Sequence, residues 1–155
     1  MNKTYLYLGK KYILEVRVGQ QNIIELSDKI YLGSSNLKYA DTYLTSWYKQ
    51  QARKIISERV YFYVTRAHLT FKSLNVGSVA ATTRWGSCSS QKNLNFNWKL
   101  IMAPIEVIDY VVTHELAHLT ELNHSRAFWE NVRRMFPLYR GYRTWLKRNG
   151  HLLTL

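Results

Sequence analysis

The nine residues from 111 to 119 read VVTHELAHL, and a third histidine, His124, follows six positions after His118. Residues four apart share one face of an α-helix, so His114 and His118 can direct two imidazoles at one ion. Zinc binds neutral imidazole nitrogens in a tetrahedral shell, and hydrolytic sites leave the fourth position to water. Glu115 is displaced just far enough to take a proton from that water. The motif therefore predicts a zinc hydrolase site with metal ligands His114, His118 and His124 and with Glu115 as catalytic base.

Chance is the simpler explanation of a short motif, because a histidine on an apolar helix is usually a packed core residue. Here three of the five histidines of the chain fall within eleven residues, at ligand spacing. The motif also lies in a strongly apolar stretch, where an unligated cluster of His and Glu side chains would be costly to bury. We therefore favour a metal site.

The third ligand has a competitor in Glu130, the nearest downstream carboxylate. We favour His124, because imidazole suits zinc and because Glu130 would have to fold back over more than one helical turn. Cys88 could also bind zinc or act as a nucleophile. A fourth protein ligand would displace the catalytic water, so we interpret Cys88 as a small apolar residue in a turn.

The composition bounds the class of protein. A chain of 155 residues with 46% apolar and 14% aromatic side chains is expected to form a single domain, residues 1–155, rather than a disordered segment. The single cysteine excludes an internal disulfide and fits a reducing compartment. We see neither a signal peptide nor a membrane span, and expect a soluble, cytoplasmic protein with no membrane partner.

The net charge of +12 favours polyanionic partners, with nucleic acid first. Residues 126–148 carry seven basic side chains against one acid, a net +6 and half of that total. The basic residues are Arg126, Arg133, Arg134, Arg140, Arg143, Lys147 and Arg148. This C-terminal face is a possible nucleic-acid surface, and an ordinary solvated helix surface is the alternative.

The hydrophobic pattern predicts an α+β fold, in which a small antiparallel or mixed sheet packs with a long N-terminal helix, a central zinc-binding helix and C-terminal helices. Four extended runs form a small antiparallel meander, at residues 4–9, 11–18, 22–26 and 29–32. A long helix follows over residues 37–64, with Ser34, Ser35 or Asn36 as its cap. No regular structure is expected over residues 66–78.

Two further strands, 79–84 and 94–98, enclose a turn-rich segment and form a hairpin just before the histidine motif. This hairpin is either the last piece of the core sheet or an edge that pairs with an extended peptide. Three helices complete the chain. They are expected over residues 104–120, from a cap at Ser125 to Pro137, and from Leu138 to Arg148 with a stop at Asn149-Gly150.

Several short motifs recur in one order along the chain. They are RWGSC (84–88), NWKL (97–100), AP (103–104), YVV (110–112), HELAH (114–118), NHS (123–125) and FW (128–129). Jointly they resemble the YgjP-like metallopeptidase family, which looks like a zincin relative of the WLM and SprT-like proteases. The resemblance implies zinc on His114, His118 and His124, Glu115 as the catalytic glutamate, and a minimal zincin-like fold with helices packed on a small sheet.

The spacing from His118 to His124 equals that of the metzincin motif, in which a glycine stands where this chain has Glu121. We therefore expect Asn123 to make the sharp turn in the left-handed region.

The leading hypothesis is a zinc-dependent hydrolase that acts on peptides or proteins, with Arg84, Tyr110 or Tyr139 as the oxyanion donor. A nucleic-acid-associated protease of the SprT or WLM kind is one alternative. A zinc hydrolase of nucleotides or phosphorylated small molecules is another, and a catalytically silent, zinc-stabilised fold is the last.

Overall fold

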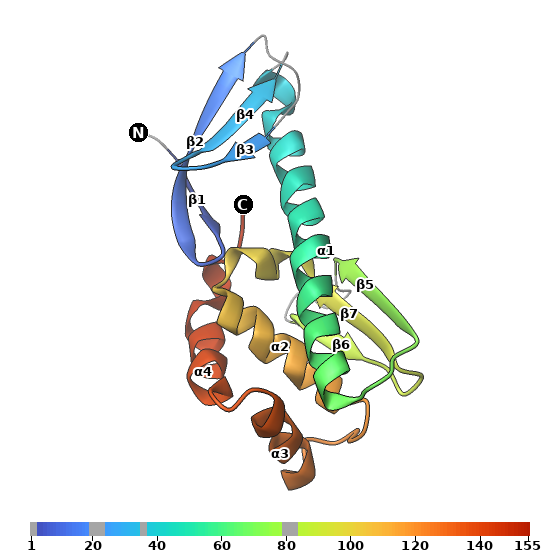
Figure 1. Ribbon diagram of the computed structural model, residues 1–155. Helices are drawn as coiled ribbons and strands as arrows, with labels where there is room; N and C mark the ends of the chain where they lie inside the picture. The colour runs from blue at the N-terminus through green and yellow to red at the C-terminus, as the bar shows by residue number, and fades with distance from the viewer. Residues whose placement is uncertain (1–2, 19–23, 35–36, 79–83) are drawn as a thin grey trace.

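The fold is seen in a computed structural model that describes residues 3–18, 24–34, 37–78 and 84–155 (Figure 1). Its longest element is α1 (Ala40–Ala67), which connects an N-terminal sheet at one end of the molecule with a second sheet near the other. Both sheets, α1 and the C-terminal helices make up the α+β architecture that the sequence predicts.

The N-terminal sheet contains β1 (Thr4–Tyr7), β2 (Lys10–Val18), β3 (Ile24–Leu26) and β4 (Ile30–Ser34), in the order β1-β2-β4-β3. The sheet is mixed, as the predicted fold class allows, but the antiparallel meander is wrong, because β2 pairs with β4 in parallel. The parallel pair makes β4 an inner strand of the sheet, and Ile30 and Leu32 of this strand are both fully buried. The more exposed β3 lies at the edge. Residues 22 and 23 of the expected third strand lie outside the described residues.

The turn between β1 and β2 fixes where this sheet meets the rest of the fold. Leu8 and Gly9 both have positive φ, and their N–H groups donate to the carbonyl oxygens of Ile101 and Met102 at 2.8 and 2.9 Å. A Cβ at Gly9 would lie 2.8 Å from Cγ of Pro104. The close approach of this turn to Pro104 therefore requires glycine.

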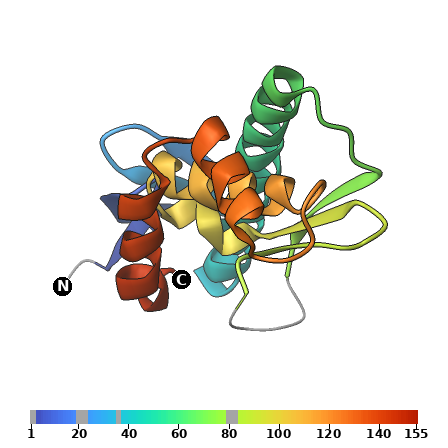
Figure 2. The ribbon, with the colours of Figure 1, turned by 90° about the horizontal axis from the view of Figure 1, so that it is seen from below.

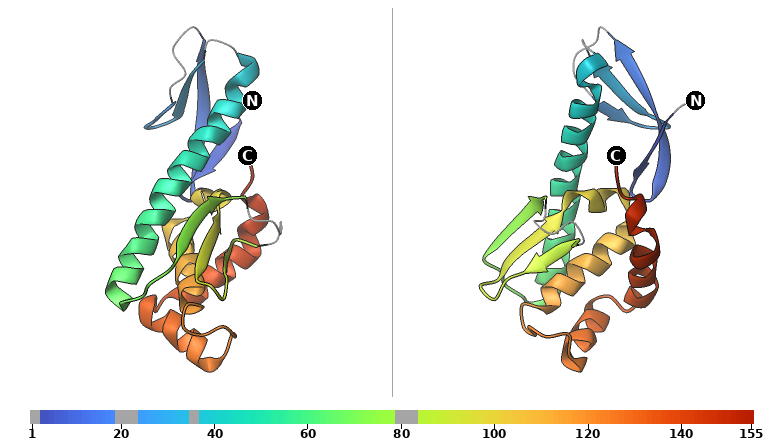
Figure 3. Two further views of the ribbon diagram at one scale, coloured as in Figure 1. Left: turned by 90° about the vertical axis from the view of Figure 1, so that its right-hand side faces the viewer. Right: turned by 180° about the vertical axis from the view of Figure 1, so that it is seen from behind.

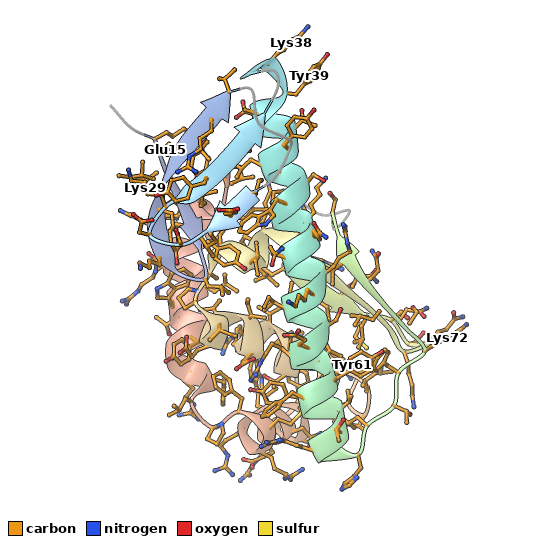
Figure 4. The ribbon with its side chains drawn as sticks, turned by 45° about the horizontal axis from the view of Figure 1, so that its top comes forward. Glu15, Lys29, Lys38, Tyr39, Tyr61 and Lys72 are labelled. Carbon is orange, nitrogen blue, oxygen red and sulfur yellow. The ribbon has the colours of Figure 1, made fainter. Side chains whose placement is uncertain are left out.

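Exposed ion pairs occupy the outer surface of the same sheet. Figure 4 shows Glu15 and Lys29 next to each other there, and their charged atoms lie 3.7 Å apart. Pairs of this kind contribute little to stability.

The helix α1 follows a 3₁₀ turn, η1 (Leu37–Tyr39), and starts and ends about three residues later than the sequence suggests. Its cap position is Tyr39, without a capping side chain, and Ser34 belongs to β4. Ser35 and Asn36 lie outside the described residues. A stripe at nearly helical spacing faces the core and comprises Leu44, Tyr48, Ala52, Ile56, Val60 and Tyr63.

The second sheet has the order β5-β7-β6, with β5 (Ser73–Gly77), β6 (Gly86–Cys88) and β7 (Asn93–Asn97). The strand β7 confirms the second predicted strand of the hairpin. The prediction of no structure over residues 66–78 is wrong, since β5 pairs in parallel with β7. The first predicted strand falls mostly on residues 79–83, outside the described chain, and β6 forms within the stretch that we expected to be a turn.

The helix α2 (Ile105–Ala117) lies at the centre and contacts α1, α3, α4 and β6 (Figure 3). It follows the 3₁₀ segment η2 (Trp98–Met102), and it ends three residues before the expected position, with His118 as its C-cap. Early termination matters, because the second histidine of the motif thereby sits at the end of the helix, where the chain turns.

The last helices are α3 (Arg126–Met135) and α4 (Tyr139–Asn149), followed by the 3₁₀ turn η3 (Gly150–Leu152). Figure 2, seen from below, shows α4 at the left of the view and α3 in the middle. Ser125 caps α3 as predicted, because its hydroxyl accepts from the N–H of Phe128 at 3.3 Å. The helix α4 ends at Asn149 with Gly150 as its C-cap, so the predicted stop is confirmed, and the chain continues directly into η3. No helix of the described residues is long and apolar enough to cross a membrane.

Candidate metal centre

The last turns of α2 are held in place from the α1 side. Arg59 donates to both carboxylate oxygens of the buried Asp109, at 2.7 and 2.9 Å. One turn later, the hydroxyl of Thr113 donates to the carbonyl oxygen of Asp109 at 2.8 Å. This anchor fixes the rotation of α2, so that His114 and Glu115 face away from the core and towards a cavity.

Three histidine side chains converge at that cavity. One ligand nitrogen from each of His114, His118 and His124 lies within 4.8 Å of the others, a group that could hold a metal ion. The Nε2 atoms of His118 and His124 are 3.2 Å apart. The structure thus brings together all three residues that the sequence predicts as ligands.

Hydrogen bonds orient two of these rings. Nδ1 of His118 lies 3.0 Å from the carbonyl oxygen of Glu121, which can only accept. Nδ1 of His114 lies 3.0 Å from Oε2 of Glu115. Nδ1 of each ring thus faces an oxygen atom, which leaves Nε2 for a metal ion, the arrangement that metal-binding histidines adopt.

The segment between His118 and His124 makes its turn without a left-handed residue at Asn123, so that prediction is wrong. Instead, the N–H groups of His118, Leu119 and Thr120 donate to carbonyl oxygens three residues earlier, at 3.1, 3.0 and 3.3 Å. These tight bonds end α2, and the Ser125 cap starts α3 directly after His124.

Aromatic rings from α3 support the histidines. Phe128 is fully buried, and its ring centroid lies 4.4 Å from that of His118. Trp129 stacks against His124 with an interplanar angle of 29° and a centroid distance of 6.2 Å. We did not predict these contacts, although His124 directly before the Ser125 cap and Trp129 at the fourth helical position have the spacing at which side chains pack across a helix start.

The electrostatics keep His124 available as a ligand. His124 is largely exposed, but partial desolvation still lowers its pKa below the usual value, and the neighbouring His114 and His118 lower it further. A neutral imidazole at pH 7 is the form that binds a metal ion. Three neutral imidazoles are a donor set that zinc accepts.

The cavity at these histidines has a volume of about 490 Å³, and β6 forms its opposite wall through Gly86, Ser87 and Cys88. Cys88 lies in this strand, so its assignment to a turn is wrong. Burial, followed by the charge of Glu115, raises the pKa of the Cys88 thiol to about 11. The thiol is therefore neutral at pH 7 and a poor nucleophile, and Cys88 does not belong to the group of converging ligand atoms.

Comparison with known proteins now identifies the family. The model of the family described as "YgjP-like, metallopeptidase domain" matches residues 1–149. The chain belongs to the YgjP-like metallopeptidase family. No curated protein matches the chain in a sequence comparison.

Two solved structures resemble this YgjP-like chain. The metallopeptidase zymogen abylysin of Pyrococcus abyssi is 18% identical with a TM-score of 0.52, over 63% of this chain and 94% of that one. The zymogen jannalysin of Methanocaldococcus jannaschii is 20% identical with a TM-score of 0.45, over 65% of this chain and 96% of that one. The likeness to abylysin shows a shared fold, as expected for a minimal metallopeptidase.

The other predicted site residues, which are the alternative ligand Glu130 and the three candidate oxyanion donors, lie at two different cavities of this YgjP-like fold. Glu130 does not belong to the histidine cluster. Its carboxylate pairs with Arg133 at 2.6 Å, and the residue lines a different cavity. Tyr139 lines that second cavity too, stacked on Trp129. Arg84 and Tyr110 do line the histidine cavity. Burial raises the pKa of Tyr110, so its hydroxyl is a neutral hydrogen-bond donor at pH 7.

Proposed function

We propose that the protein is a zinc-dependent peptidase in which His114, His118 and His124 hold the ion and Glu115 is the general base. The observation that supports this most is the convergence of three ligand nitrogens within 4.8 Å in a cavity that Glu115 also lines. Membership of a metallopeptidase family supports the same chemistry.

In the proposed mechanism, bound zinc would polarise the peptide carbonyl and acidify a water molecule. Glu115 takes a proton from the attacking water and passes it to the leaving amine nitrogen. Its side chain is 7% exposed, and Oε2 lies 3.0 Å from Nδ1 of His114, so the cavity wall restricts it to a few positions near that histidine. Tyr110 is the better placed of the two remaining oxyanion donors, because it is buried one helical turn before His114, with ring centroids 5.9 Å apart.

The strand β6 is suited to hold an extended peptide. The N–H of Asn97 donates to the carbonyl oxygen of Trp85, and the N–H of Ser89 donates to that of Asn93. Hydrogen-bonded positions alternate along an antiparallel pair, so the intervening Gly86 and Cys88 direct their N–H and C=O groups away from β7. In the part of the chain that the structure describes, β6 pairs with no strand on that side.

A peptide added there would gain backbone hydrogen bonds from Gly86 and Cys88 next to the histidine cluster. This is the edge-strand alternative for the hairpin, and the geometry favours it over a purely structural role. Backbone hydrogen bonds do not depend on the side chains of the peptide. The free edge of β6 would therefore bind an extended peptide of almost any sequence.

The experiment is a hydrolysis panel on the purified protein in three states: as isolated, stripped with a chelator, and reloaded with zinc. The panel contains unfolded proteins, short peptides, nucleoside triphosphates and phosphate monoesters. The proposal expects cleavage of peptide bonds that is lost on stripping and restored by zinc. Zinc-dependent cleavage of phosphate compounds alone would refute a peptidase and support the hydrolase alternative.

A further inference from the structure

A second cavity, of about 1030 Å³, lies between α3 and α4 and has about twice the volume of the cavity at the histidines. Five of the side chains that line it are basic. They are Arg126, Arg133, Arg140, Arg143 and Lys147, and we call this site the basic cavity. Glu130 is the single acid among its lining residues.

The positive charge of the basic cavity is largely uncompensated. Among the ion pairs of the described residues, only one involves this group, between Arg133 and Glu130. Arg143 instead lies over the ring of Trp129, with its guanidinium carbon 4.5 Å from the centroid. Arg140 donates to the hydroxyl of Tyr139 at 3.3 Å. These neutral aromatic partners orient the two guanidinium groups but leave their charge available to a ligand.

The two aromatic residues of the basic cavity, Trp129 and Tyr139, have no free ring face on which a nucleobase could stack. Trp129 and Tyr139 stack on each other, with centroids 5.5 Å apart and an interplanar angle of 19°. Tyr139 is 6% exposed, and Arg143 covers Trp129. A nucleobase would find no free ring face, whereas several guanidinium groups remain for anionic oxygen atoms.

We propose that the basic cavity binds the sugar-phosphate backbone of nucleic acid without reading its sequence. Phosphate contacts from Lys and Arg supply the affinity of sequence-independent binding. The cavity suits a run of phosphates better than one carboxylate of an acidic peptide, because five basic side chains share a wide concave site. Arg134 and Arg148 on the same helices extend the basic surface beyond it.

The basic cavity adjoins the metal centre through Trp129. One ring contact of Trp129 is with His124, and another is with Tyr139 inside the basic cavity. Nucleic acid bound there would hold the protein with its histidine cluster next to the same polymer. Binding itself requires neither zinc nor hydrolysis, so it is independent of the proposed peptidase activity.

Binding of labelled duplex DNA, followed by fluorescence anisotropy over a range of salt concentrations, tests this directly. Five phosphate contacts predict a log–log slope of about −4 to −5. The triple variant Arg126→Gln/Arg140→Gln/Lys147→Gln removes three contacts and should flatten the slope by about 3, with a loss of affinity of tenfold or more at low salt. None of the three residues belongs to the histidine cluster, so zinc content should not change.

A matched control removes three positive charges elsewhere. Arg53, Lys54 and Lys72 are exposed on α1 and just before β5, and Figure 4 shows Lys72 projecting at the far end of the second sheet. Arg53→Gln/Lys54→Gln/Lys72→Gln should keep the wild-type slope within about one unit. Equal losses in both triple variants would show diffuse attraction and would overturn the proposal.

Two measurements on the wild-type protein keep the test independent of variant folding. Hydrogen exchange with and without DNA should show protection over residues 126–149, and protection elsewhere alone would contradict the proposal. Competition with polyglutamate shows whether the basic cavity prefers the phosphates of nucleic acid or the carboxylates of an acidic polypeptide. Displacement of DNA by an equal concentration of carboxylates would assign the site to acidic protein segments and refute a nucleic-acid site, as would absence of DNA binding at low salt.

Discussion

The Nε2 atoms of His118 and His124 lie 3.2 Å apart, although six positions separate the two residues in the chain. Two nitrogen ligands of a tetrahedral zinc ion, each about 2.0–2.1 Å from the metal, lie about 3.3 Å from each other. The pair therefore already has the spacing of adjacent ligands. The carbonyl oxygen of Glu121, bonded to Nδ1 of His118, holds one partner in this orientation.

Loss of His124 should weaken metal binding more than loss of Glu130. We expect His124→Ala to reduce zinc affinity by about 100-fold or more, because removal of a direct ligand exceeds the usual effect of its hydrogen-bond partners. Glu130→Ala should retain wild-type affinity, since that carboxylate pairs with Arg133. Competition with a chromogenic chelator measures both. The reverse order of effects would make Glu130 the third ligand.

The open edge of β6 gives a prediction about substrate binding. Cys88→Pro removes an N–H that the pairing with β7 does not use, so the fold should tolerate it. The lost bond to an extended peptide should raise KM about 2- to 10-fold. Cys88→Ala is the control, since it removes the thiol and keeps the N–H. Equal KM values in the two variants would exclude β6 as the peptide-binding edge.

Gly86 allows β6 to approach Glu115. A Cβ at this position would lie 3.0 Å from Cγ of Glu115 and 3.2 Å from the carbonyl oxygen of Asn95. Gly86→Ala should therefore displace the glutamate and lower kcat by about 10- to 100-fold, with zinc retained. Gly141→Ala is the matched control, because its added Cβ meets nothing within 4 Å. Unchanged kcat in Gly86→Ala would show that the position of Glu115 does not depend on this contact.

Arg59 and Asp109 join α1 to α2, and the carboxylate is buried. Arg59→Met leaves that charge without its partner, and we expect a loss of about 3 kcal/mol in the free energy of unfolding. Urea denaturation measures it. The double variant Arg59→Met/Asp109→Leu should recover much of the loss, because an apolar pair carries no desolvation penalty. A double variant as unstable as the single one would contradict this explanation.

Local features were predictable from the sequence, and pairings between distant segments were not. The histidine cluster follows from helical spacing, and the Ser125 cap follows from its hydroxyl. The strand β5 was missed because Val76 is its one buried residue and its partner β7 lies about twenty residues away. The parallel pairing of β2 with β4 was missed because its partners, such as Leu14 and Ile30, lie sixteen positions apart with β3 between them in the chain. That residues 1–155 form one domain remains a prediction.

The walls of the site were also harder to predict than its ligands. The hairpin before the motif was expected, but not that Gly86 and Cys88 would line the cavity of Glu115. Their positions depend on the close packing of β6 on α2, which no periodicity in a three-residue strand reveals. The same holds for Trp129, whose position between the two cavities depends on how α3 packs beside α4.

The central claim is that Glu115 acts as the general base on a zinc site made by the three histidines. The most direct measurement compares peptide hydrolysis by zinc-loaded wild-type protein and Glu115→Gln at equal zinc content. The amide keeps the size of the side chain but cannot accept a proton, so we expect one zinc per chain in both proteins and a loss of turnover of at least about 100-fold in the variant. Wild-type turnover by zinc-loaded Glu115→Gln would contradict the account.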